Sequence, residues 1–169
     1  RADRMRRAWL AFLLALSSLL ATSSTSAADG FVGREVCAGC HQAEAERWSG
    51  SDHDLAMQEA TESNVLGDFD NASITHFGVT STFSRRGDKY FVQTDGPDGK
   101  LRDYEIAYTF GVYPLQQYLI AFPGGRLQAL GLAWDSRAAS DGGRHWFHLY
   151  PNEKIPAGDS LHWTGRNQN

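Results

Sequence analysis

Cysteine is scarce in this sequence: its 169 residues include only two, Cys37 and Cys40. A scaffold held by several disulfides is therefore excluded, as is a zinc site built from two CxxC pairs. Long apolar runs are also missing. The longest, Ala8 to Leu20, is shorter than the roughly 20 residues that a membrane-spanning helix needs. A fold of this chain must rest on a packed core, and 12% aromatic residues are enough to build one.

The two cysteines belong to a single motif, Cys37-Ala38-Gly39-Cys40-His41. The order CxxCH is the attachment signature of a c-type haem. Cys37 and Cys40 lie one helical turn apart, so both sulfurs can reach the two vinyl groups on one porphyrin edge. His41 shares their face, where its imidazole can bind the iron as proximal ligand. The motif therefore predicts haem c, with its iron, as the cofactor.

The same cysteine pair allows three other chemistries. A thioredoxin-like dithiol requires a preceding strand, whereas residues 31–36 are few and are interrupted by Gly33. A structural disulfide would close so small a loop that it would add little stability. A zinc site would need a fourth ligand and a second CxxC or HxxxH pair, and the sequence contains neither. Haem attachment is the interpretation that uses all three residues of the motif.

Residues 1–28 have the order of a secretory signal. Arginines flank Met5, the apolar run Ala8–Leu20 follows, and a small polar stretch ends in Ser26-Ala27-Ala28. We therefore predict a periplasmic or otherwise exported protein with no stable membrane span in its mature chain. An uncleaved anchor is the alternative interpretation. Export agrees with haem c, because this haem is attached covalently outside the cytoplasm.

The charge of the chain limits the classes of partner that it can bind. Residues 1–28 hold four of the 16 basic residues and one of the 20 acidic ones, so the mature chain is more acidic than the formal net charge of −4. An acidic surface argues against nucleic acid and anionic membranes as partners. It allows attraction of a basic redox partner, although most acidic surfaces only keep a protein soluble.

The remaining chain predicts an α+β fold. We expect a helical haem-binding segment at residues 29–66, followed at residues 67–169 by an antiparallel β-sheet region with a loose tail. The first segment would hold a helix from Cys37 to Trp48 and, after Ser51 as N-cap, a second helix from Asp52 to about Glu62. Alternating apolar residues and Gly-rich turns predict strands near residues 79–85, 90–94, 104–110, 117–122, 127–134 and 146–150.

One predicted strand has a clear pattern. Tyr104, Ile106, Tyr108 and Phe110 should line its buried face, with Thr109 pointing the other way.

Other histidines are candidates for the second axial position of the iron. On the predicted second helix, His53 and Met57 are four residues apart and share a face, so His53 is the possible distal ligand and Met57 a weaker one. His162 is a further weak alternative, because the predicted tail would leave it free to reach a haem. His145 and His148 lie an odd number apart on a predicted strand, so they face opposite sides and should only pack or face solvent.

The motif and several later runs resemble bacterial multihaem c-type cytochromes of the cytochrome c-552/c-554 domain type, which is often joined to tetratricopeptide repeats. The resemblance lies in residues 31–41, in Trp48, Ser51, His53 and Met57, and in residues 93–100, 108–111, 114–119 and 146–151. It implies His41 as proximal and His53 as distal ligand. It also implies that residues 162–169 lead into a second CxxCH, so that this chain would be an N-terminal fragment, truncated at its C-terminus.

These expectations converge on an exported, electron-transferring cytochrome. Its partners would be redox proteins or further haem domains of the same full-length chain. Two other functions stay open. A haem enzyme acting on small nitrogen compounds would keep an open coordination site on its iron, and a partner-binding β module would carry the haem only as an accessory.

Overall fold

The computed structural model describes residues 32–165, and the chain divides into two compact units between Ala45 and Glu46. Two short helices come first, α2 (Arg34–Ala38) and α3 (Gln42–Trp48). The strands are β1 (Met57–Glu59), β2 (Asp70–His76), β3 (Val79–Arg86), β4 (Lys89–Asp95), β5 (Leu101–Phe110), β6 (Leu115–Ala121), β7 (Leu127–Asp135) and β8 (Trp146–His148). Short 3-10 turns follow β6, at Pro123–Gly125, and β7, at Ala139–Asp141.

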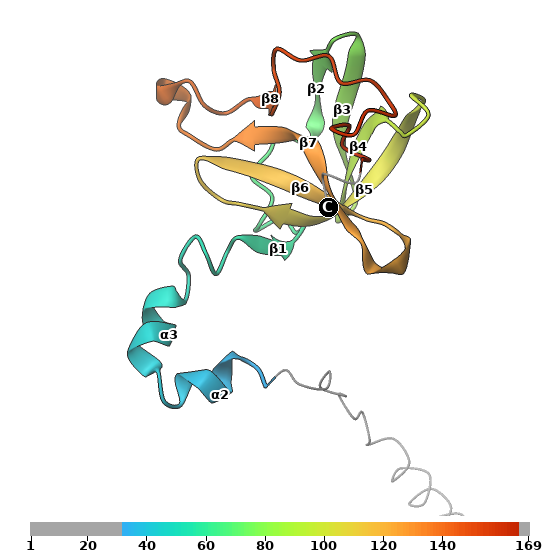
Figure 1. Ribbon diagram of the computed structural model, residues 1–169. Coiled ribbons are helices and arrows are strands. Elements are labelled where there is room, and N and C mark those ends of the chain that lie inside the picture. Colours follow the sequence, from blue (N-terminus) through green and yellow to red (C-terminus); the bar gives the residue numbers. More distant parts are fainter. Residues whose placement is uncertain (1–31, 166–169) are drawn as a thin grey trace, which may run out of the picture. The chain divides into compact units, whose positions relative to one another are not determined.

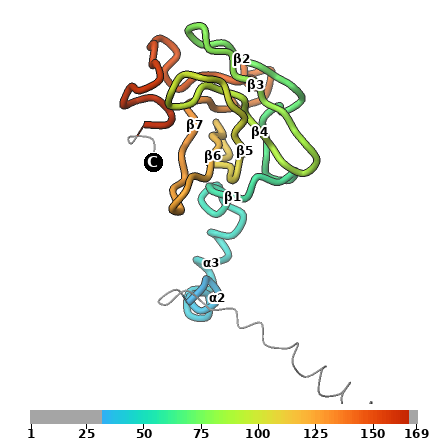
Figure 2. Tube along the Cα trace, turned by 90° about the vertical axis from the view of Figure 1, so that its right-hand side faces the viewer, coloured from blue at the N-terminus to red at the C-terminus, as the bar shows by residue number. Residues whose placement is uncertain are grey.

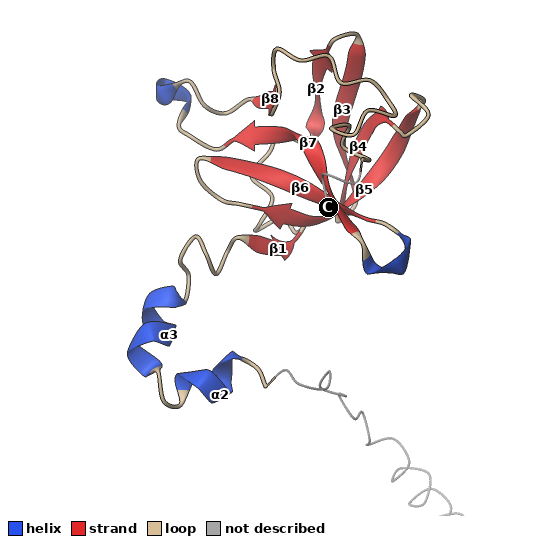
Figure 3. Ribbon diagram, in the orientation of Figure 1, coloured by secondary structure: helices blue, strands red, loops and turns tan. Residues whose placement is uncertain are grey.

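The strands of the second unit form one antiparallel sheet that curls into a nearly closed barrel (Figures 1 and 3). Strands β2 to β8 are neighbours in chain order, and β1 pairs with β5 outside that path. The first and last strands of the path, β2 and β8, come back into contact. At this seam the rings of His76 and His148 stack, with centroids 3.7 Å apart and planes 7° apart. Curling in this way leaves few unpaired strand edges.

Strand β5 is the corner of the barrel. Its first half pairs with β4, and its second half pairs with β6 on one side and β1 on the other. The register with β6 shifts between Ile106 and Tyr108, which places a bulge at Ala107. A bulge bends its strand and increases the local twist, so this one residue lets β5 belong to both halves of the sheet.

Aromatic side chains fill the barrel. Phe69 makes edge-to-face contacts with Phe83, Tyr90, Tyr118 and Trp146. Trp146 in turn stacks flat on Phe83, with centroids 3.4 Å apart. The four edge-to-face pairs, with ring centroids 5.0–5.6 Å apart, each contribute about 0.5–1.5 kcal/mol beyond the area that they bury. The core is therefore specified by ring geometry as well as by burial.

The α+β prediction is wrong: the fold is dominated by antiparallel β-structure. Helices α2 and α3 are short and contain no buried residue. The predicted strands were placed nearly correctly, because β3 to β8 occupy the expected stretches. The difference from the prediction lies in the helices, which are short and bury no residue. An α+β fold needs helices that bury an apolar face against a sheet.

The second predicted helix, Asp52 to Glu62, does not form. Its expected cap is partly present, since the Asp54 N–H lies 3.4 Å from Ser51 Oγ and Asp54 Oδ2 accepts from the Gly50 N–H at 2.8 Å. The chain then leaves the helical path after one turn, and residues 57–59 pair with residues 108–110 of β5. Hydrogen bonds from Gly111 N to Ala56 O and from Ala60 N to Ala107 O frame this pairing. Pairing with a distant strand outweighed a local capping signal.

The segment after β8 is not a loose tail over its described length, which ends at residue 165. It folds back against the strands (Figure 2). Trp163 is buried, lies edge-on to Tyr104 at 4.8 Å and donates from Nε1 to the Asp95 carbonyl at 2.7 Å. The Gln128 side chain donates to the Gly165 carbonyl at 3.0 Å. Residues 150–165, called the C-terminal strap below, are therefore part of the barrel unit.

Candidate functional site

The CxxCH motif begins at the end of α2. Cys37 lies in α2, and its carbonyl accepts hydrogen bonds from the N–H of Cys40 at 3.2 Å and of His41 at 3.0 Å. The chain then continues as a helix, because the His41 carbonyl accepts a hydrogen bond from the N–H of Ala45 at 3.0 Å. The three candidate haem residues thus lie within a single hydrogen-bonded turn. That is the local arrangement that two thioethers and a proximal imidazole require.

The motif is open to solvent. Cys37 and Cys40 are exposed and free, with no disulfide between them, and His41 is exposed as well. Apolar side chains beside the motif are uncovered too, with Val32 67% and Val36 62% exposed. Two accessible thiols, one accessible imidazole and uncovered valines fit a porphyrin that is attached covalently and shields apolar surface.

The two candidate distal ligands do not share a helix face. His53 lies exposed in the turn that follows α3, and Met57 is the first residue of β1, about half exposed. The spacing of four placed them together only on a helix, and the chain is not helical there. Both residues belong to the barrel unit, whereas the CxxCH motif belongs to the other compact unit.

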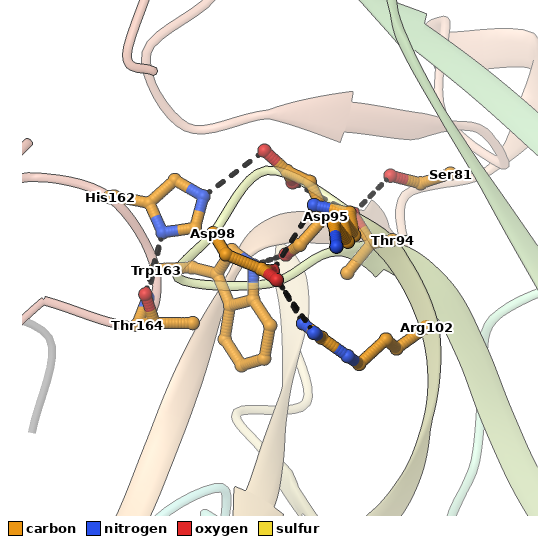
Figure 4. A network of polar contacts seen from close by, with 9 residues as sticks. Ser81, Thr94, Asp95, Asp98, Arg102, His162, Trp163 and Thr164 are labelled. Carbon is orange, nitrogen blue, oxygen red and sulfur yellow. Dashed lines mark hydrogen bonds and ion pairs between the residues drawn. The ribbon is translucent and has the colours of Figure 1, made fainter. Parts of the chain in front are cut away.

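His162 is the candidate that the structure changes most. The residue is only 3% exposed, and its Nε2 lies 3.2 Å from Asp95 Oδ2 (Figure 4). Its Nδ1 lies 2.8 Å from Thr164 Oγ1 and accepts from the Thr164 N–H at 3.3 Å. Both ring nitrogens therefore have partners within the barrel unit, and the residue is not free in the way that a loose tail would allow.

A polar chain runs through the barrel from this pair. Ser81 Oγ lies 2.7 Å from Thr94 Oγ1, and Thr94 in turn lies 3.3 Å from Asp95 Oδ1 (Figure 4). Burial by itself would raise the pKa of Asp95, but the hydrogen bond and the charge of His162, with the bond from Thr94, hold it below its ordinary value. Asp95 is thus an ionised carboxylate with both oxygens engaged.

A pocket of about 360 Å³ lies where the C-terminal strap meets the barrel. Its wall includes Leu130 and Leu132 of β7, the stacked His76 and His148, and Trp163 of the strap. This volume falls within the range of small-molecule sites. Sequence reasoning missed the pocket, because its residues come from five separate strands and the strap. Gly131 inside a strand pattern was the one available signal.

Among the residues 32–165, no three histidine, cysteine, aspartate or glutamate side chains are grouped as a metal-ion site. This includes the three histidines around the pocket and the side chains of the CxxCH motif as they stand. In the same part of the chain, none of the helices is both long and apolar enough to cross a bilayer.

Comparisons with protein-family models, with curated proteins and with solved structures return no match to this chain. The resemblance to multihaem cytochromes therefore rests on the residues of the sequence. The predicted secretory signal, residues 1–28, lies outside the described part of the chain.

Proposed function

We propose that this protein is an exported c-type cytochrome that binds haem covalently and transfers electrons. The single observation that carries the proposal is the motif Cys37-Ala38-Gly39-Cys40-His41, with its thiols free and its residues within one hydrogen-bonded turn. Cys37 and Cys40 would form the thioethers, and His41 would hold the iron as proximal ligand.

The chain's own part in this function is attachment, orientation and shielding. The turn places Cys37 and Cys40 three residues apart in one hydrogen-bonded turn, and the hydrogen bond from the His41 N–H to the Cys37 carbonyl fixes the backbone position of His41. The exposed Val32 and Val36 offer apolar surface for a porphyrin ring to cover. Once bound, haem c supplies one-electron chemistry at its iron.

The wider assignment follows from the same proposal. Export to the periplasm, through residues 1–28, would bring the chain to the compartment where haem c is attached. The partners would be redox proteins, or further haems of a longer chain as in the multihaem cytochromes that the sequence resembles. The acidic mature chain would favour basic partners.

The direct test is covalent haem in the purified protein. Co-expression with a c-type maturation system should give a band that stains for haem after denaturing electrophoresis, because thioether bonds survive denaturation. Replacing both thiols (Cys37→Ser with Cys40→Ser) should abolish the stain while the barrel unit keeps its fold, since neither cysteine belongs to that unit. A wild-type chain that never stains would overturn the proposal.

Replacing His53 separates electron transfer from the enzyme alternative. If His53 is the distal ligand, His53→Ala should shift the ferric absorption spectrum toward high spin, because the sixth position loses a strong ligand. His145→Ala is the matched control, as His145 is also exposed and was not assigned to the iron. A low-spin spectrum that His53→Ala leaves unchanged would remove His53 from this role. A wild-type protein already high-spin would favour the open iron site of an enzyme.

A further inference from the structure

The pocket between the barrel and the C-terminal strap is largely apolar. Ile74 and Val79 come from the β2–β3 hairpin, Leu130 and Leu132 from β7, and Ile155 and Leu161 from the strap. The side chains of Trp163 and the His76–His148 stack add flat ring surfaces. A lining of this kind selects a ligand with an apolar body.

The sequence keeps this space open at Gly131. A Cβ built there would lie 3.5 Å from His148 Nε2 and 3.8 Å from Trp163 Cβ, which are ordinary contact distances. Any side chain longer than a methyl group would therefore enter the space between the strand and the strap. Glycine weakens a strand interior, and one common reason for its presence is the close approach of a ligand. Gly131 also lies between Ala129 and Ala133, where the register of β6 and β7 shifts, and such a bulge is another common reason for a strand glycine. The position therefore shows that the space is open, and the polar groups of the pocket indicate what could occupy it.

Two polar groups of the pocket, His148 and Lys154, are available to a ligand as donors. His148 Nδ1 accepts from the Tyr150 N–H at 3.0 Å, so the neutral ring carries its proton on Nε2, next to Gly131. Lys154 lines the pocket as an exposed cation, and among residues 32–165 no ion pair engages it. The carboxylate of Asp95 already accepts from Thr94 and His162. The His148 Nε2–H and the Lys154 ammonium thus offer one N–H donor and one positive charge to a ligand.

We propose that this pocket binds a small monocarboxylate, with its hydrocarbon body against Leu130, Leu132 and Trp163 and its carboxylate facing His148 Nε2 and Lys154. The proposal is independent of haem, because every residue of the pocket lies in the barrel unit. Burial of the ligand's hydrocarbon body would provide most of the affinity. The end of the pocket with His148 and Lys154 would decide which head group the pocket accepts.

The test compares three molecules that share one hydrocarbon chain: octanoate, 1-octanol and octylamine. Isothermal titration of the full chain should give saturable binding in the order octanoate, octanol, octylamine. In the variant lacking both cysteines (Cys37→Ser with Cys40→Ser), octanoate should bind equally well, which separates this result from the fate of the haem proposal. Absence of saturable octanoate binding, or octylamine binding as tightly as octanoate, would overturn the proposal.

Two variants place the binding in this pocket. Lys154→Gln should weaken octanoate by up to about fivefold, the upper range for an exposed ion pair, and leave octanol unchanged. Lys89→Gln is the control, because Lys89 lies outside the pocket and pairs with Glu105. Gly131→Val should weaken both ligands by about tenfold, since a side chain longer than a methyl group would enter the binding space. Lys154 is exposed, so its replacement tests the proposal even if the Gly131 variant fails to fold. Octanoate affinity unchanged in Lys154→Gln would contradict the placement of the carboxylate.

Discussion

At the scale of residues, the Asp95–His162 pair connects two distant parts of the chain. The two residues are 67 positions apart, and their pair joins the end of β4 to the C-terminal strap. Asp95 also accepts Trp163 Nε1 on its carbonyl, so one residue anchors two side chains of the strap. Breaking a buried pair leaves a charge or a polar group without a partner, which costs more than the pair itself contributes.

The stability contributed by this pair should depend on pH. In the folded protein the pKa of Asp95 lies below its ordinary value of 3.8, so the contribution is complete above that value and is lost as the pH falls through the lower folded pKa. Asp95→Asn should lower the free energy of unfolding by about 1.5–3 kcal/mol at pH 7. Urea unfolding of both proteins at several pH values from 7 to 3 would measure the difference.

The control for that comparison is Asp88→Asn, which changes an exposed carboxyl in the turn between β3 and β4. It should change stability little at any of these pH values. A difference between wild type and Asp95→Asn that stays constant below pH 3.8 would contradict the assigned role of the Asp95 carboxylate.

At the scale of elements, the bulge at Ala107 decides which side chains of β5 are inside. Alternation from Tyr104 placed Phe110 on the buried face and Thr109 on the other. In the structure Thr109 is 1% exposed and Phe110 is 46% exposed. One extra residue in a strand exchanges the faces of everything beyond it, because side chains alternate with a period of two. The prediction was correct up to Ile106 and wrong after the bulge.

Stability measurements can detect this exchange. Ile106→Ala should lower the free energy of unfolding by about 2–5 kcal/mol, as expected for a buried aliphatic side chain. Phe110→Ala should cost much less, because the ring is already half in solvent. Chemical unfolding of the two variants beside wild type would give both values. Equal, large losses would mean that β5 keeps its alternation without a bulge.

At the scale of the whole barrel unit, closure depends on the seam between β2 and β8. His76 Nε2 lies 3.1 Å from the Tyr150 carbonyl, and the ring of His76 stacks on His148. Burial lowers the pKa of His148, and the neighbouring His76 lowers it further. Protonation of His148 therefore favours the unfolded or opened chain. The contacts between β2 and β8 should therefore be stable at neutral pH and weaken in mild acid.

This seam gives a second pH-dependent prediction. Because the folded pKa of His148 is below its ordinary value of 6.5, stability should fall as the pH decreases below about that value. His148→Phe keeps a ring for stacking but cannot be protonated, so its stability should fall less between pH 7 and pH 5. Thermal unfolding across this range would compare the slopes. His145→Phe, at an exposed position, is the control and should keep the wild-type slope.

The short-range features of this protein could be read from its sequence. The CxxCH turn is local, since its hydrogen bonds span three and four residues, and the hairpins β3–β4 and β6–β7 follow turn residues and alternation within one stretch of chain. These patterns depend on neighbours that the sequence itself places together. The haem attachment proposed for Cys37, Cys40 and His41 likewise depends only on residues that lie close together in the sequence.

Contacts between residues far apart in the sequence arise only in the folded chain. Residues 57–59 have a helix signal before them, yet they form a strand because β5 offers unpaired backbone groups. Likewise His162 and Trp163 are buried because Asp95, far away in the sequence, receives their hydrogen bonds. The pocket exists only where β7, the His76–His148 seam and the strap converge. Pairing energies between distant segments are gained only on closure of the barrel, so a local pattern could not reveal them.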